Sequence, residues 1–265
     1  MLYNLGVLVQ RLTSGLLGLL FVGCAVLAPR PAELPVRATA APAEPNWTLI
    51  GGYSTTFDLD QKERSHNIQQ AVLALDGATL KPGEHWSFNQ AVGPRTHERG
   101  YQIAPVLEFE GARPALGGGI CQVSTTVYNA ALLADLAVKQ RHPHSRPVAY
   151  VELGRDATVS WGSKDLQMAN PHDFPLRFHA HIAGNRLVVR LYGKAPLEYE
   201  VRLTIADSEP ASPRKEYQTL DDSDRIAVVG VWVKLYRHRL KDGSVYETER
   251  VGRSSFYPFR VKERR

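Results

Sequence analysis

Three consecutive glycines, Gly117 to Gly119, lead into Cys121, the residue of this chain best suited to nucleophilic chemistry. From Val123 to Leu133 apolar residues recur at intervals of three and four, which predicts a helix. At a helix start, unpaired N–H groups and the positive end of the dipole favour a thiolate and can lower a cysteine pKa from about 8.5 to ~3.5–7.5. The alternative is a structural turn, in which glycine permits close backbone approach and the cysteine is a small buried hydrophobic residue.

A cysteine nucleophile needs a base, usually a histidine that the fold brings close. Of the nine histidines, the most suggestive are His142 and His144 in Arg-His-Pro-His-Ser, directly before a predicted strand at 148–153. His144, at this loop-to-strand junction, is therefore the predicted base. A solvated loop is the alternative for both histidines. Together with Asp156 they could also bind a metal, but no HExxH or CxxC spacing supports a metal site.

The third role is to hold the imidazole in one orientation. Asp156 and Asp165 are the candidates because each lies next to a predicted strand, where acids also commonly form turns. Gln122, Ser124 and the backbone amides before Gln122 are suited to an oxyanion hole, although Ser124 and Thr125 are equally suited to capping a helix. The predicted contacts to substrate or oxyanion are Gly118, Gly119, Gln122, Ser124, Thr125, Asn89 and Tyr101.

The N-terminal segment, residues 1–28, has the layout of a secretory signal peptide or a membrane anchor. After a basic flank, the run Leu12–Leu27 is uncharged and mostly apolar, and a Pro- and Ala-rich linker follows at 29–45. We therefore expect an extracytoplasmic protein of the cell envelope, with this segment cleaved, lipidated or retained. One of the two cysteines, Cys24, falls in the segment, so Cys121 is expected to be a lone exported thiol without a disulfide partner.

The rest of the pattern predicts an α+β fold: a mainly antiparallel sheet with a central helix that carries the cysteine at its N-terminus. The expected domain spans 46–195, and 196–265 is a β-rich C-terminal extension. Helices are predicted at 64–75 and from 123 to near 136. Strands are predicted at 47–57, 86–88, 101–109, 148–153, 157–161, 176–182, 186–192, 197–205, 225–236, 244–251 and 256–261, with polar loops at 89–100 and 208–224.

The net charge and the absence of certain motifs limit the classes of ligand and partner that we expect. A net charge of +5 and a pI of about 9.2 are compatible with a polyanionic neighbour, but the basic residues are scattered and no nucleic-acid motif accompanies them. The glycine run is not a phosphate-binding loop, since no Gly-Lys-Ser/Thr follows it, and no GxSxG elbow is present. We expect no cofactor, no metal and no nucleic acid.

Several blocks of the sequence, taken together, resemble the VanW family over roughly residues 50–195. The blocks are RSHNIQQAVLALDGATLKPGEHWSFNQAVGPRT (64–96), GY (100–101), GGGICQVSTTVYNAALLADL (117–136), RHPHSRPVAYVELGRDATVSWGSKDLQMAN (141–170) and FPLRFHA (174–180). The family is found in bacterial surface proteins and takes its name from vancomycin-resistance clusters. Some of its domains look like cysteine-dependent L,D-transpeptidases, which would make 3–3 cross-links in peptidoglycan.

The resemblance implies roles for three residues of this chain: Cys121 as nucleophile, His144 as base and Asp156 as the orienting acid. The leading hypothesis is therefore acyl transfer on peptidoglycan stem peptides by a protein that reaches the membrane through its N-terminal segment. One alternative is a non-catalytic envelope module that binds peptidoglycan or a glycopeptide. The other is a cysteine peptidase that hydrolyses stem peptides at the same site.

Overall fold

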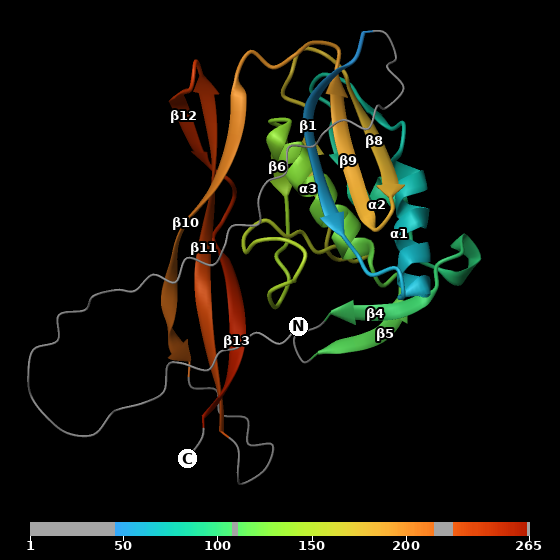
Figure 1. Ribbon diagram of the computed structural model, residues 1–265, viewed down its shortest axis with the longest axis vertical. Helices are drawn as coiled ribbons and strands as arrows, with labels where there is room; N and C mark the ends of the chain where they lie inside the picture. Colours follow the sequence, from blue (N-terminus) through green and yellow to red (C-terminus); the bar gives the residue numbers. More distant parts are fainter. Residues whose placement is uncertain (1–45, 108–110, 215–224, 264–265) are drawn as a thin grey trace, which may run out of the picture. The chain divides into compact units, whose positions relative to one another are not determined.

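The computed structural model describes residues 46–107, 111–214 and 225–263, and it confirms an α+β fold built mainly of antiparallel strands (Figure 1). The helices are α1 (Lys62–Leu75), α2 (Phe88–Val92) and α3 (Ile120–Leu133), with a 3-10 turn at His97–Arg99. The strands are β1 (Thr48–Thr56), β2 (Thr79–Leu80), β3 (His85–Ser87), β4 (Ile103–Leu107), β5 (Ala112–Leu116), β6 (Ala137–Gln140), β7 (Gln167–Ala169), β8 (Leu176–Ala183), β9 (Arg186–Gly193), β10 (Glu200–Arg214), β11 (Arg225–Lys241), β12 (Ser244–Arg250) and β13 (Ser255–Glu263).

The main sheet has the strand order β1-β9-β8-β2, with antiparallel pairing throughout. The tight turn at Gly184 and Asn185 joins β8 to β9, as the sequence predicts. Alternate residues of β8, including Leu176, Phe178 and Ala180, are buried toward the helices. One face of this sheet therefore contributes to the core.

Helix α3 runs through the centre of the core, as predicted, and packs against β1 and β9 (Figure 1). It is buried on nearly every side, because its sequence is dominated by small and apolar residues such as Ala130 and Ala131. It ends three residues earlier than predicted, with Ala134 as its C-cap, and Asp135 follows in the left-handed region at φ 58°. Because α3 is buried in this way, the side chains of its first turn are held in a fixed position.

Two smaller β units flank the core near the start of α3. Strands β3, β7 and β6 form a three-stranded sheet, and β4 pairs with β5 in a hairpin. The β4–β5 hairpin leads directly into the glycine run, so the chain reaches α3 from a strand. The sequence predicted the strand at β4 but not its partner β5.

The C-terminal strands form a separate sheet in which β11 pairs with β10, β12 and β13. The β11–β12 hairpin turns at Asp242 and Gly243, both at positive φ, which agrees with the predicted turn. Arg237 and Arg239 reach from β11 to the Asp135 carboxylate, at 3.0 Å and 2.7 Å. The end of α3 is thus tied to this sheet by buried ion pairs.

Two predicted strands beside the site are wrong. Residues 148–153 form turns and bends, and 157–161 make only isolated bridges at Thr158 with His142 and at Ser160 with Lys164. Their β-forming residues give a local preference, but a strand also requires a neighbour that pairs with it, and within the described residues neither segment pairs with one beyond these bridges. Both segments are instead irregular chain beside the cysteine.

Two predicted loops are partly wrong. The segment 89–100 contains most of α2, whose N-terminus is capped by the Ser87 hydroxyl accepting from Gln90 N at 3.1 Å, and the 3-10 turn. The segment from 208 to Arg214 continues β10 against β11, with register shifts that accommodate its prolines. The remainder of that predicted loop, 215–224, lies outside the described residues.

The predicted signal or anchor at 1–28 and the linker at 29–45 also lie outside the described residues. Within the described ranges, no helix has both the length and the apolar character needed to span a membrane. The proposed domain boundaries at 46–195 and 196–265 stay a prediction.

Candidate active site

A cleft of about 1130 Å³ opens above the first turn of α3 and exposes one side of the cysteine. Its walls come from the β4–β5 hairpin, the glycine run and the irregular segments 144–150 and 158–164. Cys121 and His144 both line it, so the two residues predicted to do the chemistry share one cavity. The cleft is the natural place for a substrate.

The glycine run lets the backbone turn sharply into α3. A Cβ on Gly118 would lie 2.7 Å from backbone atoms of Ala104 and Pro105, so only glycine fits against β4 there. Gly119 is the N-cap of α3 at φ 105°, a conformation that favours glycine. Cys121 follows as the second residue of the helix, at the position that the sequence predicted.

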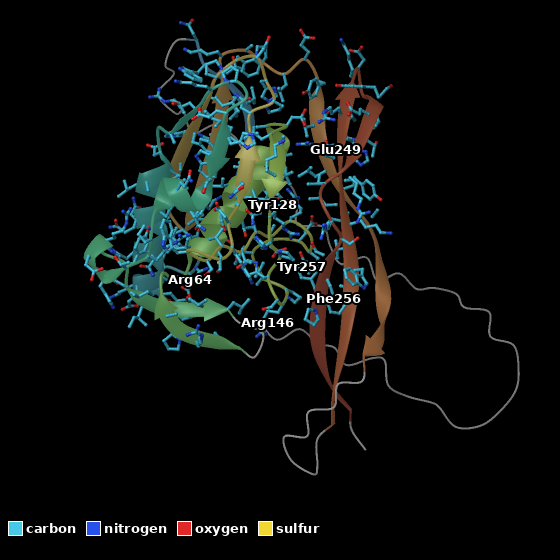
Figure 2. All side chains as sticks on the ribbon, turned by 180° about the vertical axis from the view of Figure 1, so that it is seen from behind. Arg64, Tyr128, Arg146, Glu249, Phe256 and Tyr257 are labelled. Carbon is cyan, nitrogen blue, oxygen red and sulfur yellow. The ribbon has the colours of Figure 1, made fainter. Side chains whose placement is uncertain are left out.

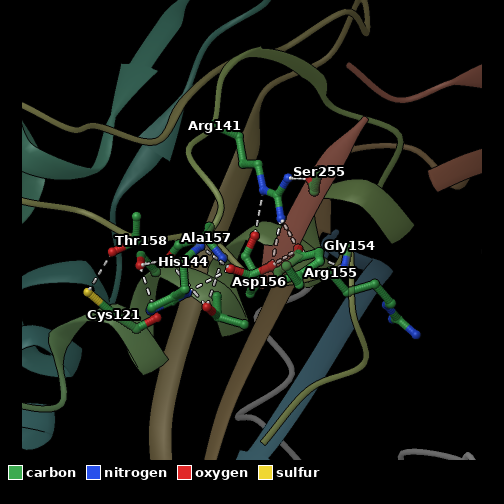
Figure 3. A network of polar contacts seen from close by, with 12 residues as sticks. Cys121, Arg141, His144, Gly154, Arg155, Asp156, Ala157, Thr158 and Ser255 are labelled. Atoms are coloured by element: carbon green, nitrogen blue, oxygen red, sulfur yellow. Dashed lines mark hydrogen bonds and ion pairs between the residues drawn. The ribbon is translucent and has the colours of Figure 1, made fainter. Parts of the chain in front are cut away.

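Besides its interaction with His144, the Cys121 thiol has two long contacts. Its Sγ lies 3.4 Å from Thr158 Oγ1 and donates to the Val159 carbonyl at 3.5 Å (Figure 3). Both partners belong to the irregular segment that was predicted to be a strand. The sulfur is half-buried, and its other side faces the cleft.

His144 and Asp156 form a tight buried pair beside the thiol. The His144 Nδ1 lies 2.6 Å from Asp156 Oδ2, and the same carboxylate oxygen accepts from the His144 backbone N–H at 2.6 Å (Figure 3). With Nδ1 engaged in this way, Nε2 is the ring nitrogen left for the thiol. The structure thus brings Cys121, His144 and Asp156 together in the order that a nucleophile, a base and an orienting acid require.

Two further residues that the sequence did not suggest complete the surroundings of Asp156. Arg141 Nη2 donates to Asp156 Oδ1 at 2.7 Å and its Nε donates to the Asp156 carbonyl at 2.6 Å. The Tyr257 hydroxyl, from β13, donates to the same Oδ1 and accepts from Gly154 N at 2.8 Å. Arg141 could have been found from the sequence, because it lies in the same short block as His144. The sequence around Tyr257 gives no such indication.

The pKa values describe an activated pair. Burial raises the pKa of the Cys121 thiol, but the hydrogen bond and positive charge of His144 and the contact with Thr158 lower it to about 7. Burial lowers the pKa of His144, but the hydrogen bonds to Asp156 and Cys121 raise it to about 9. Near pH 8 these directions favour a thiolate facing an imidazolium.

The orienting acid stays ionised. Burial raises the pKa of Asp156, but its hydrogen bond to His144 and the charge of Arg141 outweigh burial and lower it to about 2. The carboxylate is only 1% exposed and accepts four hydrogen bonds, so it holds the imidazole in one tautomer.

The first turn of α3 also offers a group for a developing oxyanion. The Cys121 backbone N–H forms no hydrogen bond with any other residue that the structure describes, as expected for the start of a helix. Gln122 lines the cleft, but its side-chain amide donates to Thr55 Oγ1 at 2.9 Å and to the Thr56 carbonyl at 2.8 Å. The backbone of Cys121 is therefore the better-placed donor.

The other predicted contacts lie around the cleft rather than in it, apart from Gly119, which lines it. The hydroxyls of Ser124 and Thr125 are buried and bond the Ala157 backbone, which fixes the segment next to Asp156. Gly118 O accepts from Asn67, and Tyr101 is buried in the core.

Asn89 and Asp165 belong to a second polar cluster beneath one wall of the cleft. Asp165 accepts from Ser87 Oγ at 2.6 Å and from Asn89 N at 2.9 Å, so the structure does not bring it to His144. Asn89 Nδ2 donates to the carbonyls of Ser160 and Lys164. His142 lies 2.9 Å from Gln140 Nε2 through its own Nε2 and does not line the cleft.

The described chain is thus an α+β protein in which a cysteine, a histidine and an aspartate meet at a helix start. Residues 63–192, about half of the chain, match the sequence family described as "VanW like protein". No solved structure matches the chain.

Two relatives carry the same region. "Uncharacterized protein YoaR" of Bacillus subtilis is 41% identical over 153 residues, which is 58% of this chain and 50% of the relative. "Vancomycin B-type resistance protein VanW" of Enterococcus faecalis is 26% identical over 146 residues, 53% of each chain. The chain therefore spans about half the length of these curated relatives.

Proposed function

We propose that this protein is a cysteine acyltransferase of the cell envelope that acts on peptidoglycan stem peptides, like an L,D-transpeptidase. The observation that carries the proposal is the linked arrangement of Asp156, His144 and Cys121, in which Cys121 and His144 line the cleft and Asp156 is buried. The substrate class rests on the resemblance to VanW domains, and the vancomycin resistance named in one relative concerns the same cell wall. The N-terminal segment would place the protein outside the cytoplasm.

In the acylation step, the Cys121 thiolate attacks the carbonyl carbon of the third stem-peptide residue and forms a C–S bond. The carbonyl oxygen becomes an oxyanion, which the Cys121 backbone N–H stabilises. As the C–N bond breaks, the His144 imidazolium gives its Nε2 proton to the leaving amine, and D-alanine departs. Asp156 stays ionised and keeps the ring oriented.

In the second step, the amine of another stem peptide attacks the thioester carbonyl. Neutral His144 takes the proton that this amine loses, the C–S bond breaks, and the Cys121 thiolate returns. Water in place of the amine would give hydrolysis by the same residues. The two outcomes differ only in the second substrate, so the product decides between transferase and peptidase.

The alternative of a non-catalytic binding module is less consistent with the site. A module that only binds has no need of a thiol with a pKa near 7 paired with a buried, charged histidine. A buried ion pair is costly unless its geometry is excellent, and here the carboxylate end satisfies that condition with four donors.

The test uses the full chain, a tetrapeptide donor and a separate amine acceptor. We expect mass spectrometry to find a tripeptidyl thioester on Cys121, free D-alanine, and a product joined through the third residue of the donor. Cys121→Ala should give none of these. A wild-type protein that binds the donor without forming a thioester would contradict the proposal, and tripeptide as the sole product would identify a peptidase.

A further inference from the structure

The cleft around the thiol is strongly cationic. Its lining includes five basic side chains, Arg64, Arg95, Arg113, Arg146 and Lys164. Among the described residues that line it, none is an aspartate or a glutamate. A cavity with charges of one sign concentrates ligands of the opposite sign.

Two of these cations flank the nucleophile. Arg64 and Arg95 both interact electrostatically with Cys121, one from α1 and the other from the segment after α2. Burial lowers the pKa of each guanidinium, which means that each charge is partly removed from water.

Both arginines are held by neutral acceptors. Arg64 Nη2 donates to Gln122 Oε1 at 2.5 Å, and Arg95 Nη1 donates to Asn89 Oδ1 at 2.8 Å and to the Gly93 carbonyl at 3.0 Å. Neither forms an ion pair with a described carboxylate. Arg95 Nη2 is buried and has no hydrogen-bond partner in the part of the chain described. Burial lowers the pKa of Arg64 and Arg95 more than the charges of Asp58 and Asp165, respectively, raise it. A bound anion would further offset the cost of burying these cations.

We propose that Arg64 and Arg95 form a carboxylate-binding subsite next to Cys121, which receives a carboxylate lying within one residue of the bond that is cleaved. In a peptide donor, this is the α-carboxylate of a C-terminal residue that serves as leaving group. The inference deepens the proposed function and rests on it for the identity of the substrate. The chemical preference itself, for an anion beside the sulfur, can be measured without any peptide.

The first experiment compares alkylation of Cys121 by iodoacetate and by iodoacetamide, which differ by one carboxylate close to the reacting carbon. The ratio of the two rates does not depend on how much thiolate is present, because both reagents need it. We expect Arg95→Gln and Arg64→Gln each to lower the iodoacetate-to-iodoacetamide ratio about threefold to tenfold. The exposed Arg202→Gln is the matched control and should leave the ratio unchanged.

Salt gives a second readout on the unmodified protein. The ratio should fall as ionic strength rises, because screening weakens attraction to the reagent's charge. A ratio that is insensitive to salt and equal in wild type, Arg64→Gln and Arg95→Gln would overturn the inference. If a glutamine variant does not fold, Arg95→Lys and Arg64→Lys can be used instead. Because lysine keeps the positive charge, the iodoacetate-to-iodoacetamide ratio should stay close to that of the wild type.

The second experiment compares peptide donors that end in a free carboxylate or a carboxamide. Wild type should prefer the carboxylate by about tenfold or more in kcat/KM, and the arginine variants should lose that preference. If the alkylation ratio behaves as expected but no peptide reacts, the subsite stands and the proposed function fails. Peptide transfer without any preference for the carboxylate donor would contradict the carboxylate-binding subsite but would still support the proposed function.

A different observation supports a second inference, which concerns the C-terminal strand β13. Alternate residues of this strand, Ser255 and Tyr257, are buried against the site, while Phe256 lies on the other side of the strand and packs on Trp232 (Figure 2). Tyr257 bonds the Asp156 carboxylate, and Ser255 accepts from Arg141 Nη1. Both residues lie outside the matched region 63–192.

We infer that Ser255 and Tyr257 are positioning residues, which fix the Asp156–Arg141 pair and through it His144. Removing the Tyr257 hydroxyl takes away one of the two donors to Asp156 Oδ1, leaving Arg141, and it leaves Gly154 N without its acceptor. The carboxylate is then held less firmly, the imidazole is less well oriented, and the thiolate loses part of its stabilisation. The pH dependence of Cys121 alkylation should report this loss, which a purely structural role would not produce.

The test compares Tyr257→Phe with Tyr246→Phe, an exposed tyrosine on β12. Tyr257→Phe should move the midpoint of the alkylation profile upward from about 7 by several tenths of a unit, and Tyr246→Phe should not. Ser255→Ala should give a smaller shift in the same direction, and it serves if Tyr257→Phe does not fold. Profiles identical to wild type in these variants would overturn the inference.

Discussion

The two ends of the candidate site are built differently. At the carboxylate end, Asp156 is 1% exposed and accepts hydrogen bonds from His144, Arg141 and Tyr257. At the thiol end, Cys121 faces a cleft and, besides its interaction with His144, has two contacts longer than 3.3 Å. The two ends therefore have different roles. The orienting acid is held in one position, whereas the sulfur can move toward a carbonyl carbon and away from it again.

Removing the nucleophile should have the largest effect. Because Cys121 alone forms the covalent bond, Cys121→Ala should lower transfer about 10⁴-fold or more. The measurement is the rate of D-alanine release from a tetrapeptide. Since the thiol makes only weak contacts, the variant should unfold at nearly the same temperature as wild type, and a large loss of stability would contradict the comparison of the two ends.

Neutralising the locked acid should come next. Asp156→Asn removes the charge that stabilises the imidazolium and presents an NH₂ group to a set of donors, so we expect a loss of about 10²–10⁴-fold in rate. Unlike Cys121→Ala, it should also lower the melting temperature, because buried donors lose their acceptor. Thermal unfolding and kinetics measured on the same samples check both effects, and an unchanged melting temperature would argue against a locked carboxylate.

Removing the base His144 should raise the pKa of the Cys121 thiol. In wild type the alkylation rate should rise with a midpoint near pH 7, the pKa of Cys121. In His144→Gln the two largest factors that lower this pKa, the hydrogen bond and the charge of His144, are lost while burial still raises it, so the midpoint should move above about 8.5. At pH 7 the rate should fall by about 15-fold or more. A midpoint that stays near 7 would show that the helix start activates the thiol without the histidine.

The smallest effect should come from the weak contact at the thiol end. Thr158 lies 3.4 Å from the sulfur and contributes less to lowering the thiol pKa than His144 does. Thr158→Val should raise the midpoint of alkylation by a few tenths of a unit, about twofold in rate at pH 7. An effect as large as that of His144→Gln would mean that the thiol end is held more firmly than its geometry indicates.

Much of the site could be predicted from the sequence because its signals are local. Three glycines before an apolar helix place Cys121 at a helix start, and His144 and Asp156 stand in one short segment with Arg141. The β8–β9 and β11–β12 hairpins were likewise marked by turn residues. In each case a short stretch of chain contains all the information that its conformation requires.

The missed features depend on contacts between distant parts of the chain. The segment 148–153 has strand-forming residues, but within the described chain it does not pair with another strand. The prolines after 208 do not end β10, because β11 pairs with it along this stretch and the pairing only shifts register. Tyr257 reaches Asp156 across 101 positions, and no local pattern distinguishes it from other tyrosines. The importance of Arg64 and Arg95 becomes visible only in the structure, where both line the cleft and form hydrogen bonds to neutral acceptors.

The same 101-residue separation has a consequence for how the molecule matures. Contacts between residues far apart in sequence generally form late in folding, because closing a long loop costs entropy before the contact stabilises it. A folding chain can therefore assemble α3, with Cys121 in its first turn, while Asp156 still lacks the cover of β13. We expect the thiol to become fully reactive only when the last strand docks. The timing would limit the exposure of an activated nucleophile to its surroundings before the fold is complete.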